Sequence, residues 1–178
     1  MLGAGRPGWH IECTMIARRF VNGPLTVQAG GSDLTFPHHD LGAGHSWAVD
    51  HRSHARHYAH TGMVGLDGHK MSKSRGNLVL VSKLRAAGID PNAIRLAILD
   101  NHYRSDWFWT DDLLYKADAR LETYRHAIAA ATGNDTEGAV KTLDKVREYL
   151  ADDLNAPEAL KALDAWAIDC LLYTSPSP

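Results

Sequence analysis

The spacing of apolar residues changes along the chain, and the changes divide it into elements. An apolar face at helical spacing predicts a short helix over residues 9–20. The segment 25–31 ends in paired glycines and predicts a strand followed by a tight turn. A polar loop follows, and we expect a helix over roughly 39–57.

The middle of the chain carries turn and cap signals. Asp67-Gly68 is a hairpin-type turn signal. It precedes the basic loop 70–74, after which an apolar, β-branched run resumes. Asp90 followed by Pro91 is a good cap and first position for a further helix. The first part of the chain is therefore predicted to be α/β.

From Thr110 onward the spacing is helical throughout. Gly133-Asn134 separates the first two helices, and Asn155 caps the third. The apolar positions that step at this spacing, and that we expect to face inward, are Leu114, Ala117, Leu121, Tyr124 and Ile128, then Val140, Leu143, Val146 and Leu150, then Leu160, Leu163 and Ala167.

These patterns predict three regions. Residues 1–104 form a partial α/β domain, residues 105–170 form an all-α helical bundle, and residues 171–178 form an anomalous tail that is disordered or foreign. The chain opens as if inside a domain, so we expect it to be truncated.

Composition narrows the class. The 178 residues are 44% hydrophobic and 22% charged, as in an ordinary globular protein. A net charge of −2 argues against a large nucleic-acid footprint. Two cysteines cannot build a disulfide framework, and no apolar run has the length of a membrane span. We expect a cytoplasmic monomer without a membrane partner.

The loop "KMSKS" (residues 70–74) has the composition of a phosphate-binding segment. Lys70 and Lys73 are flexible point charges that suit phosphates which move during a reaction. The small residues leave backbone N–H groups free to donate to an anion. A solvated surface loop is the alternative, because most charge runs lie on solvated faces.

Cys13 and His38 are candidate zinc ligands, since thiolate and neutral imidazole both suit zinc. Spacing alone favours a buried structural cysteine beside a hydrogen-bonded histidine. The other notable histidines are spaced three apart, and we interpret them as a solvated helix face; they are His51, His54, His57 and His60.

Four motifs in order, "GRPGWHIEC", "GGSDLTFPHH", "HTGMVGLDGHKMSKSRGN" and "HYRSDW", resemble the class I cysteine-activating enzymes. This family contains the cysteinyl-tRNA synthetases and the mycothiol-pathway ligases that join cysteine to glucosaminyl-inositol. The resemblance implies the C-terminal half of a Rossmann-like catalytic domain, with an adenylate at the carboxyl edge of the sheet.

The resemblance implies one Zn²⁺, held by Cys13, His38 and a cysteine in a missing N-terminal part. In this family the metal binds the thiolate of the substrate cysteine. The tRNA synthetases carry a further glutamate ligand four residues after the histidine, where this chain has Gly42. The chain therefore resembles the ligase branch. His45 is interpreted as a surface or core histidine.

The other family positions concern the nucleotide. The resemblance implies that Trp9 packs against the adenylate, although it could equally anchor the core. It implies that Val64 contacts the adenine through its backbone, with a core position as the alternative. Lys70 and Lys73 match the lysines that hold the ATP phosphates in this family. The adenylate-binding turn is matched by Gly31, Ser32 and Asp33, which a plain tight turn also explains.

The implied reaction is an AMP-forming ligation. Cysteine and ATP, with Mg²⁺, give cysteinyl-adenylate and pyrophosphate, and the amine of an amino-sugar inositol then displaces AMP. We expect this chain to be inactive alone. The alternatives are a cysteinyl-tRNA synthetase fragment and a non-catalytic zinc- or nucleotide-binding fragment.

Overall fold

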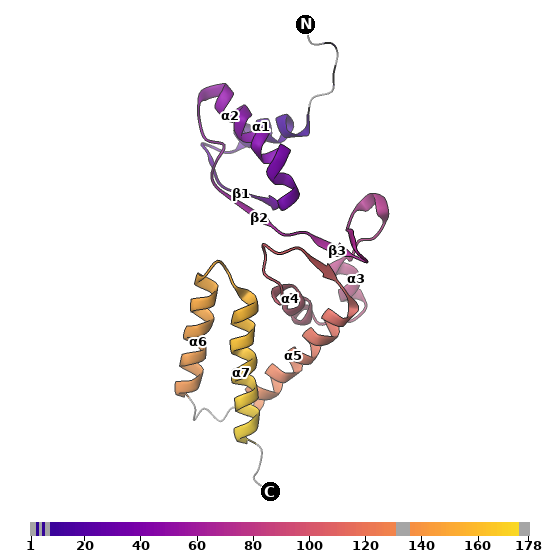
Figure 1. Ribbon diagram of the computed structural model, residues 1–178, viewed down its shortest axis with the longest axis vertical. Helices are drawn as coiled ribbons and strands as arrows, with labels where there is room; N and C mark the ends of the chain where they lie inside the picture. The colour runs from indigo at the N-terminus through magenta and orange to yellow at the C-terminus, as the bar shows by residue number, and fades with distance from the viewer. Residues whose placement is uncertain (1–2, 4, 6–7, 131–135, 175–178) are drawn as a thin grey trace. The chain divides into compact units, whose positions relative to one another are not determined.

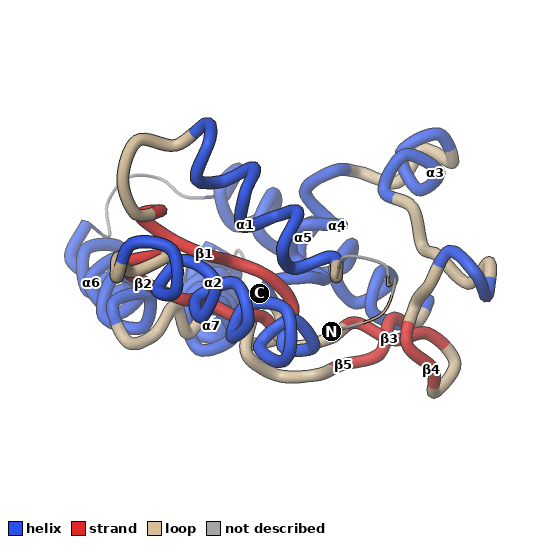
Figure 2. Tube along the Cα trace, turned by 90° about the horizontal axis from the view of Figure 1, so that it is seen from above, coloured by secondary structure: helices blue, strands red, loops and turns tan. Residues whose placement is uncertain are grey.

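The computed structural model describes residues 3, 5, 8–130 and 136–174. The chain divides into two compact units, Met1–Met63 and Val64–Pro178. Each mixes helices and strands, so the α/β expectation holds, and the elements are followed in Figures 1 and 2. The domain boundary expected after residue 104 remains a prediction, although the compact units divide after Met63.

The first unit is built around two parallel strands. Its elements are α1 (Trp9–Phe20), β1 (Leu25–Gly31), a short 3-10 turn (Ser32–Leu34), a π-type turn (Thr35–His39), α2 (Asp40–Asp50) and β2 (Ala55–Thr61). The parallel register joins Leu25 to Ala55 and Gly31 to Thr61. The helix over 9–20 and the strand over 25–31 are confirmed.

The helix expected over 39–57 is wrong beyond Asp50. His51 has a φ of 56°, and this left-handed residue ends α2. The chain then extends as β2, because pairing with β1 satisfies its backbone. The histidine series is consequently not a solvated helix face: His57 and His60 lie on β2, and His54 contacts Ser46 at 2.8 Å.

The second unit begins with a small sheet of order β4-β3-β5. Its strands are β3 (Val64–Leu66), β4 (His69–Lys70) and β5 (Trp107–Trp109). Asp67 and Gly68 both have positive φ, 51° and 75°, which confirms the predicted tight turn between antiparallel β3 and β4. The run after the basic loop is not a strand, because it leads into helix α3 (Val81–Ala86).

Four longer helices complete this unit: α4 (Pro91–Leu99), α5 (Asp111–Ala130), α6 (Thr136–Ala151) and α7 (Ala156–Thr174). Asp90 caps α4 by accepting a bond from the Asn92 N–H at 2.7 Å, as predicted. Asn155 accepts from the Glu158 N–H at 3.4 Å at the start of α7. The predicted break at Gly133-Asn134 lies outside the described residues.

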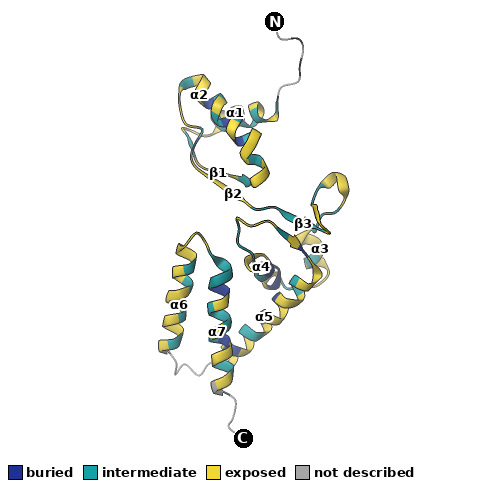
Figure 3. Ribbon diagram, in the orientation of Figure 1, coloured by how far each residue is buried: buried dark blue, intermediate teal, exposed yellow. Residues whose placement is uncertain are grey.

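The core of the second unit joins α4, β5 and α5. Its buried members are Ala93, Ala97, Trp109, Ala117 and Leu121. In α7, Leu160 and Ala167 are buried as predicted. Figure 3 colours the helices by burial, with buried positions in dark blue. Ile128 is exposed instead, and Ala127 takes the buried position.

The apolar stripe of α6 is mostly exposed, contrary to expectation. Val140, Leu143 and Leu150 are 56%, 47% and 42% exposed. Helix α7 continues to Thr174 and so includes the first residues of the segment 171–178, whose assignment as a disordered or foreign tail remains a prediction. Residues 175–178 lie outside the described part of the chain.

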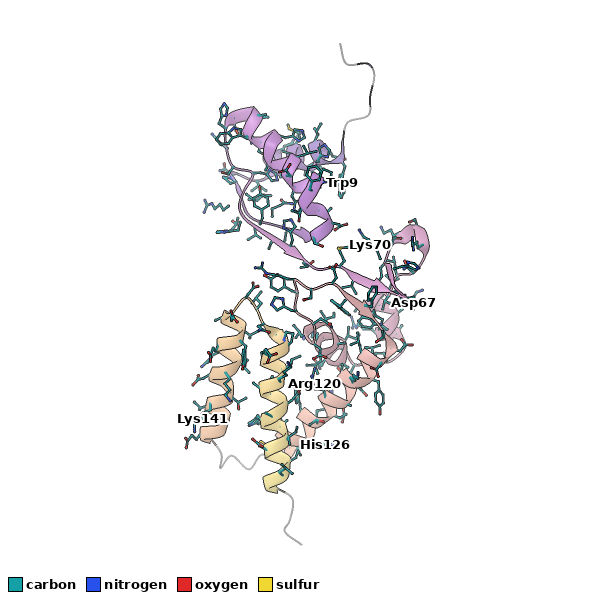
Figure 4. The ribbon with its side chains drawn as sticks, viewed as in Figure 1. Trp9, Asp67, Lys70, Arg120, His126 and Lys141 are labelled. Atoms are coloured by element: carbon teal, nitrogen blue, oxygen red, sulfur yellow. The ribbon has the colours of Figure 1, made fainter. Side chains whose placement is uncertain are left out.

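An ion-pair network connects three helices of the second unit. Arg120 on α5, which Figure 4 labels, contacts Asp100 after α4 at 2.8 Å and Asp164 on α7 at 3.0 Å. Tyr124 donates to Asp164 at 2.7 Å, and burial together with this carboxylate raises the pKa of the phenol. None of the described helices is long and apolar enough to cross a membrane.

Candidate functional site

Two of the predicted site residues, Trp9 and His38, come together in the first unit. The indole of Trp9 stacks on the imidazole of His38, with ring centroids 3.9 Å apart and planes inclined by 27° (Figure 4 labels Trp9). Cys13 lies four residues after Trp9 on α1, and hence on the same helix face. It is half-buried and forms no disulfide. Cys13 therefore shares a helix face with Trp9, whose indole stacks on His38.

The chemistry of this place suits a metal. The Nδ1 atom of His38 is buried and has no hydrogen-bond partner within the described residues. Buried polar atoms normally have partners, so a cation or water is the expected complement. The two donor types fit zinc. In residues 8–130 and 136–174, however, no three His, Cys, Asp or Glu side chains form a potential metal cluster. The pair is thus an incomplete set.

The helix that carries Cys13, α1, is closely packed against α2 at Gly42. Gly42 is buried on α2, and a Cβ there would lie 3.2 Å from the Thr14 Oγ1 on α1. Thr14 has little freedom to move away, because its hydroxyl donates to the His10 carbonyl at 2.7 Å and it is 2% exposed. The position that carries a carboxylate in the tRNA synthetase branch is therefore crowded here.

Alanine substitutions at two α2 glycines test this packing. Gly44→Ala is expected to raise the free energy of unfolding by about 0.5–1 kcal/mol, because a Cβ there meets nothing within 4 Å. In Gly42→Ala the new Cβ would lie against Thr14. The free energy of unfolding of this variant is therefore expected to be about 1–2 kcal/mol lower than that of Gly44→Ala. Urea unfolding of both variants measures the difference. Equal gains at the two positions would show that α1 and α2 are not tightly packed.

A hydrogen-bonded chain of side chains centred on His39 was not predicted from the sequence. His39 is 4% exposed. Its Nε2 lies 2.9 Å from the Gln28 Nε2, and its Nδ1 lies 2.7 Å from the His60 Nε2. These bonds fix the π-type turn to both strands. No short sequence pattern predicts these hydrogen bonds, since the partners of His39 come from β1 and β2.

Two histidines of the first unit, His39 and His54, make stability depend on pH. Burial is the main cause that lowers the pKa of His39, with nearby His60 adding to it, and burial likewise lowers the pKa of His54. The unfolded chain then binds protons that the folded chain does not. Stability is therefore expected to fall as pH drops through about 6.5, the ordinary histidine pKa.

Urea unfolding at about pH 8 and about pH 5.5 measures this loss. In His54→Asn, one of the two titrating groups is absent, so the difference between the two pH values should shrink. The same difference in wild type and variant would contradict the role of His54.

The predicted adenylate turn lies at the carboxyl end of β1. Gly31 ends the strand, and a Cβ on it would lie 2.6 Å from the Asp33 Oδ1 and 3.1 Å from the Met63 sulfur. Ser32 and Asp33 follow in the 3-10 turn and are exposed. In parallel sheets this edge is where ligands bind.

The basic loop belongs to the second unit. Lys70 ends β4, Lys73 begins a 3-10 turn (Lys73–Arg75), and both lysines are exposed. Val64 pairs with Trp107 in the parallel β3–β5 ladder, and its side chain packs against the core. The candidate metal ligands and the adenylate turn thus belong to the first unit, and the basic loop and Val64 belong to the second.

Comparison with known proteins identifies the class. Residues 1–119 match the family described as "tRNA synthetases class I (C) catalytic domain", and the chain belongs to this family. A solved structure, described as the ternary complex of Agrobacterium radiobacter K84 agnB2 LeuRS-tRNA-LeuAMS, has the same fold with a TM-score of 0.62. It is 16% identical and covers 84% of this chain and 23% of that chain, so it speaks for the fold alone.

The curated relatives are more specific. The chain is 73% identical over 180 residues to L-cysteine:1D-myo-inositol 2-amino-2-deoxy-alpha-D-glucopyranoside ligase of Rothia mucilaginosa (strain DY-18), covering 98% of this chain. It is 63% identical to the ligase of the same name from Kocuria rhizophila (strain ATCC 9341 / DSM 348 / NBRC 103217 / DC2201), over 93% of this chain. The chain spans 40% and 37% of the lengths of these relatives. The resemblance to the ligase branch is confirmed.

Proposed function

We propose that this chain is part of an ATP-dependent ligase that activates L-cysteine as cysteinyl-adenylate and joins it to the amine of glucosaminyl-inositol. The observation that carries the proposal is the 73% identity to a relative named as that ligase. Gly42 supports the same branch, because it provides no carboxylate and is packed against Thr14.

Each predicted site residue has a part in this proposal. Cys13 and His38 hold zinc together with a ligand from outside the described residues, and the metal, when bound, selects the thiolate of cysteine over the hydroxyl of serine. Trp9 covers His38 and lies beside the bound substrate. Gly31, Ser32 and Asp33 bind the nucleotide at the exposed edge of β1.

The remaining residues serve ATP, which enters with Mg²⁺. A carboxylate oxygen of cysteine attacks the α-phosphorus, and the bond to pyrophosphate breaks. Lys70 and Lys73 balance the charge on the departing phosphates. Val64 provides a backbone contact for the adenine. The amine nitrogen of the acceptor then attacks the carbonyl carbon, loses a proton and releases AMP. Positioning and charge stabilisation carry both steps.

The test uses a chimera in which this chain replaces the matching 40% of the Rothia mucilaginosa ligase. The chimera, but not the 178-residue chain alone, is expected to catalyse cysteine-dependent ATP–pyrophosphate exchange. It should transfer cysteine to glucosaminyl-inositol and not to tRNA. Cysteinylation of tRNA would favour the synthetase branch. A chimera without exchange activity, zinc or nucleotide binding would favour a non-catalytic fragment.

A further inference from the structure

The basic loop is closed by a residue that lies outside the KMSKS motif. The Oδ1 of Asn77 accepts a hydrogen bond from the Ser72 N–H at 2.9 Å. The Nδ2 of the same side chain donates to the Lys70 carbonyl at 3.2 Å. One amide group therefore connects the strand that enters the loop with the segment that leads from the loop to α3. Both of its polar atoms are used in these bonds.

The loop between these anchor points is held in a defined shape. Met71 and Val79 pack against the core of the second unit on the two sides of Asn77. Lys73 opens a single 3-10 turn, which Gly76 ends with a left-handed φ of 69°. The Ser72 and Ser74 hydroxyls lie 3.3 Å apart at the start of this turn. The exposed residues thus form a short arc whose base is the Asn77 amide.

The arc presents cations on one short segment. Lys70, Lys73 and Arg75 are all exposed, although the chain as a whole has a net charge of −2. Like charges on one short segment repel each other, and this repulsion disfavours a compact loop. A neutral amide that bonds to the backbone can hold this arc without neutralising any lysine.

We infer that Asn77 is a positioning residue that keeps the basic loop in the conformation that receives the phosphates of ATP. This inference rests on the proposed function, since it assigns the phosphates to this loop. Asn77 acts through Lys70 and Ser72, whose backbone it holds, and it does not need to touch the nucleotide. Preorganised charges stabilise a transition state without reorganisation at the moment of reaction, and Asn77 provides that preorganisation.

Two substitutions separate the two hydrogen bonds. Asn77→Ala removes both of them. Asn77→Asp keeps an acceptor for the Ser72 N–H but turns a second oxygen toward the Lys70 carbonyl, which repels it. Ser82→Ala is the matched control, because Ser82 is exposed on α3 of the same unit and lies outside the loop.

The first experiment needs no activity. Trypsin cleaves after lysine and arginine, so Lys70, Lys73 and Arg75 report the opening of the loop in the 178-residue chain. Asn77→Ala is expected to be cleaved here about tenfold faster than wild type, and Ser82→Ala at the wild-type rate, while urea unfolding stays close to wild type. Equal cleavage of Asn77→Ala and wild type would overturn the inference.

The second experiment measures the consequence for ATP in the Rothia chimera. Asn77→Ala is expected to raise the KM for ATP in pyrophosphate exchange about tenfold, with the KM for cysteine unchanged. Its effect should be smaller in a Lys73→Ala background, because one of the two lysines that the loop positions is then absent. A merely structural role would affect both substrates and add to the effect of Lys73→Ala.

The outcomes distinguish the two proposals. Unchanged kinetics in an active Asn77→Ala chimera would overturn the positioning role and leave the proposed function in place. A wild-type chimera without exchange would overturn the proposed function, and with it the role of Asn77 toward ATP. The trypsin result would then still decide whether Asn77 closes the loop.

Discussion

Serine in place of Cys13 is expected to remove zinc from the Rothia chimera and to lower its cysteine-dependent pyrophosphate exchange by at least about 100-fold. The physical reason is that a hydroxyl is a much poorer zinc ligand than a thiolate. Metal analysis of the purified chimera and the exchange assay measure the two effects. Because Cys13 lies one turn from Trp9, its loss should leave the Trp9–His38 stack in place.

Cys170→Ser is the matched control for this prediction. Cys170 is the other cysteine of the chain, it is half-buried, and it lies on α7 in the second unit. The same substitution there should retain both zinc and exchange. Zinc retained in the Cys13 variant, or lost equally in both variants, would remove Cys13 from the proposed metal site.

Local signals predicted the elements that local chemistry determines. The helix over 9–20, the strand over 25–31 and the cap at Asp90 follow from spacing, turn residues and capping, and the structure has all three. The turn at Asp67-Gly68 belongs with them, since few other residue pairs accept two positive φ angles in sequence.

The wrong predictions of secondary structure arise where contacts with residues distant in the sequence determine the element. α2 stops at a left-handed His51, and β2 follows because β1 is available as a parallel partner. The sequence of residues 51–61 does not indicate that this segment pairs with β1. The spacing of its histidines therefore suggested a helix face. In the last turns of α5, Ala127 is buried and Ile128 is exposed, which the apolar spacing did not predict.

The candidate site divides in the same way. Sequence motifs indicated which residues to examine, whereas the stack of Trp9 on His38 joins positions from α1 and the π-type turn. The bond from His39 to His60 spans 21 residues. Such contacts depend on the βαβ arrangement and have no short-range pattern. The roles of the site residues remain predictions, which the substitutions address one at a time.

Alanine in place of Lys73 is expected to lower pyrophosphate exchange by about 10²–10³-fold in the Rothia chimera, because charge that develops on the departing phosphates loses its partner. Lys73 is exposed, so urea unfolding should stay close to wild type. Lys83→Ala, an exposed lysine on α3, controls for the loss of a positive charge from the same unit and should keep full exchange. Lys73→Arg retains the charge and should recover part of the activity. Equal losses in the Lys73 and Lys83 alanine variants would mean that the loop contributes only general electrostatic attraction, and the direct phosphate contact would have to be abandoned.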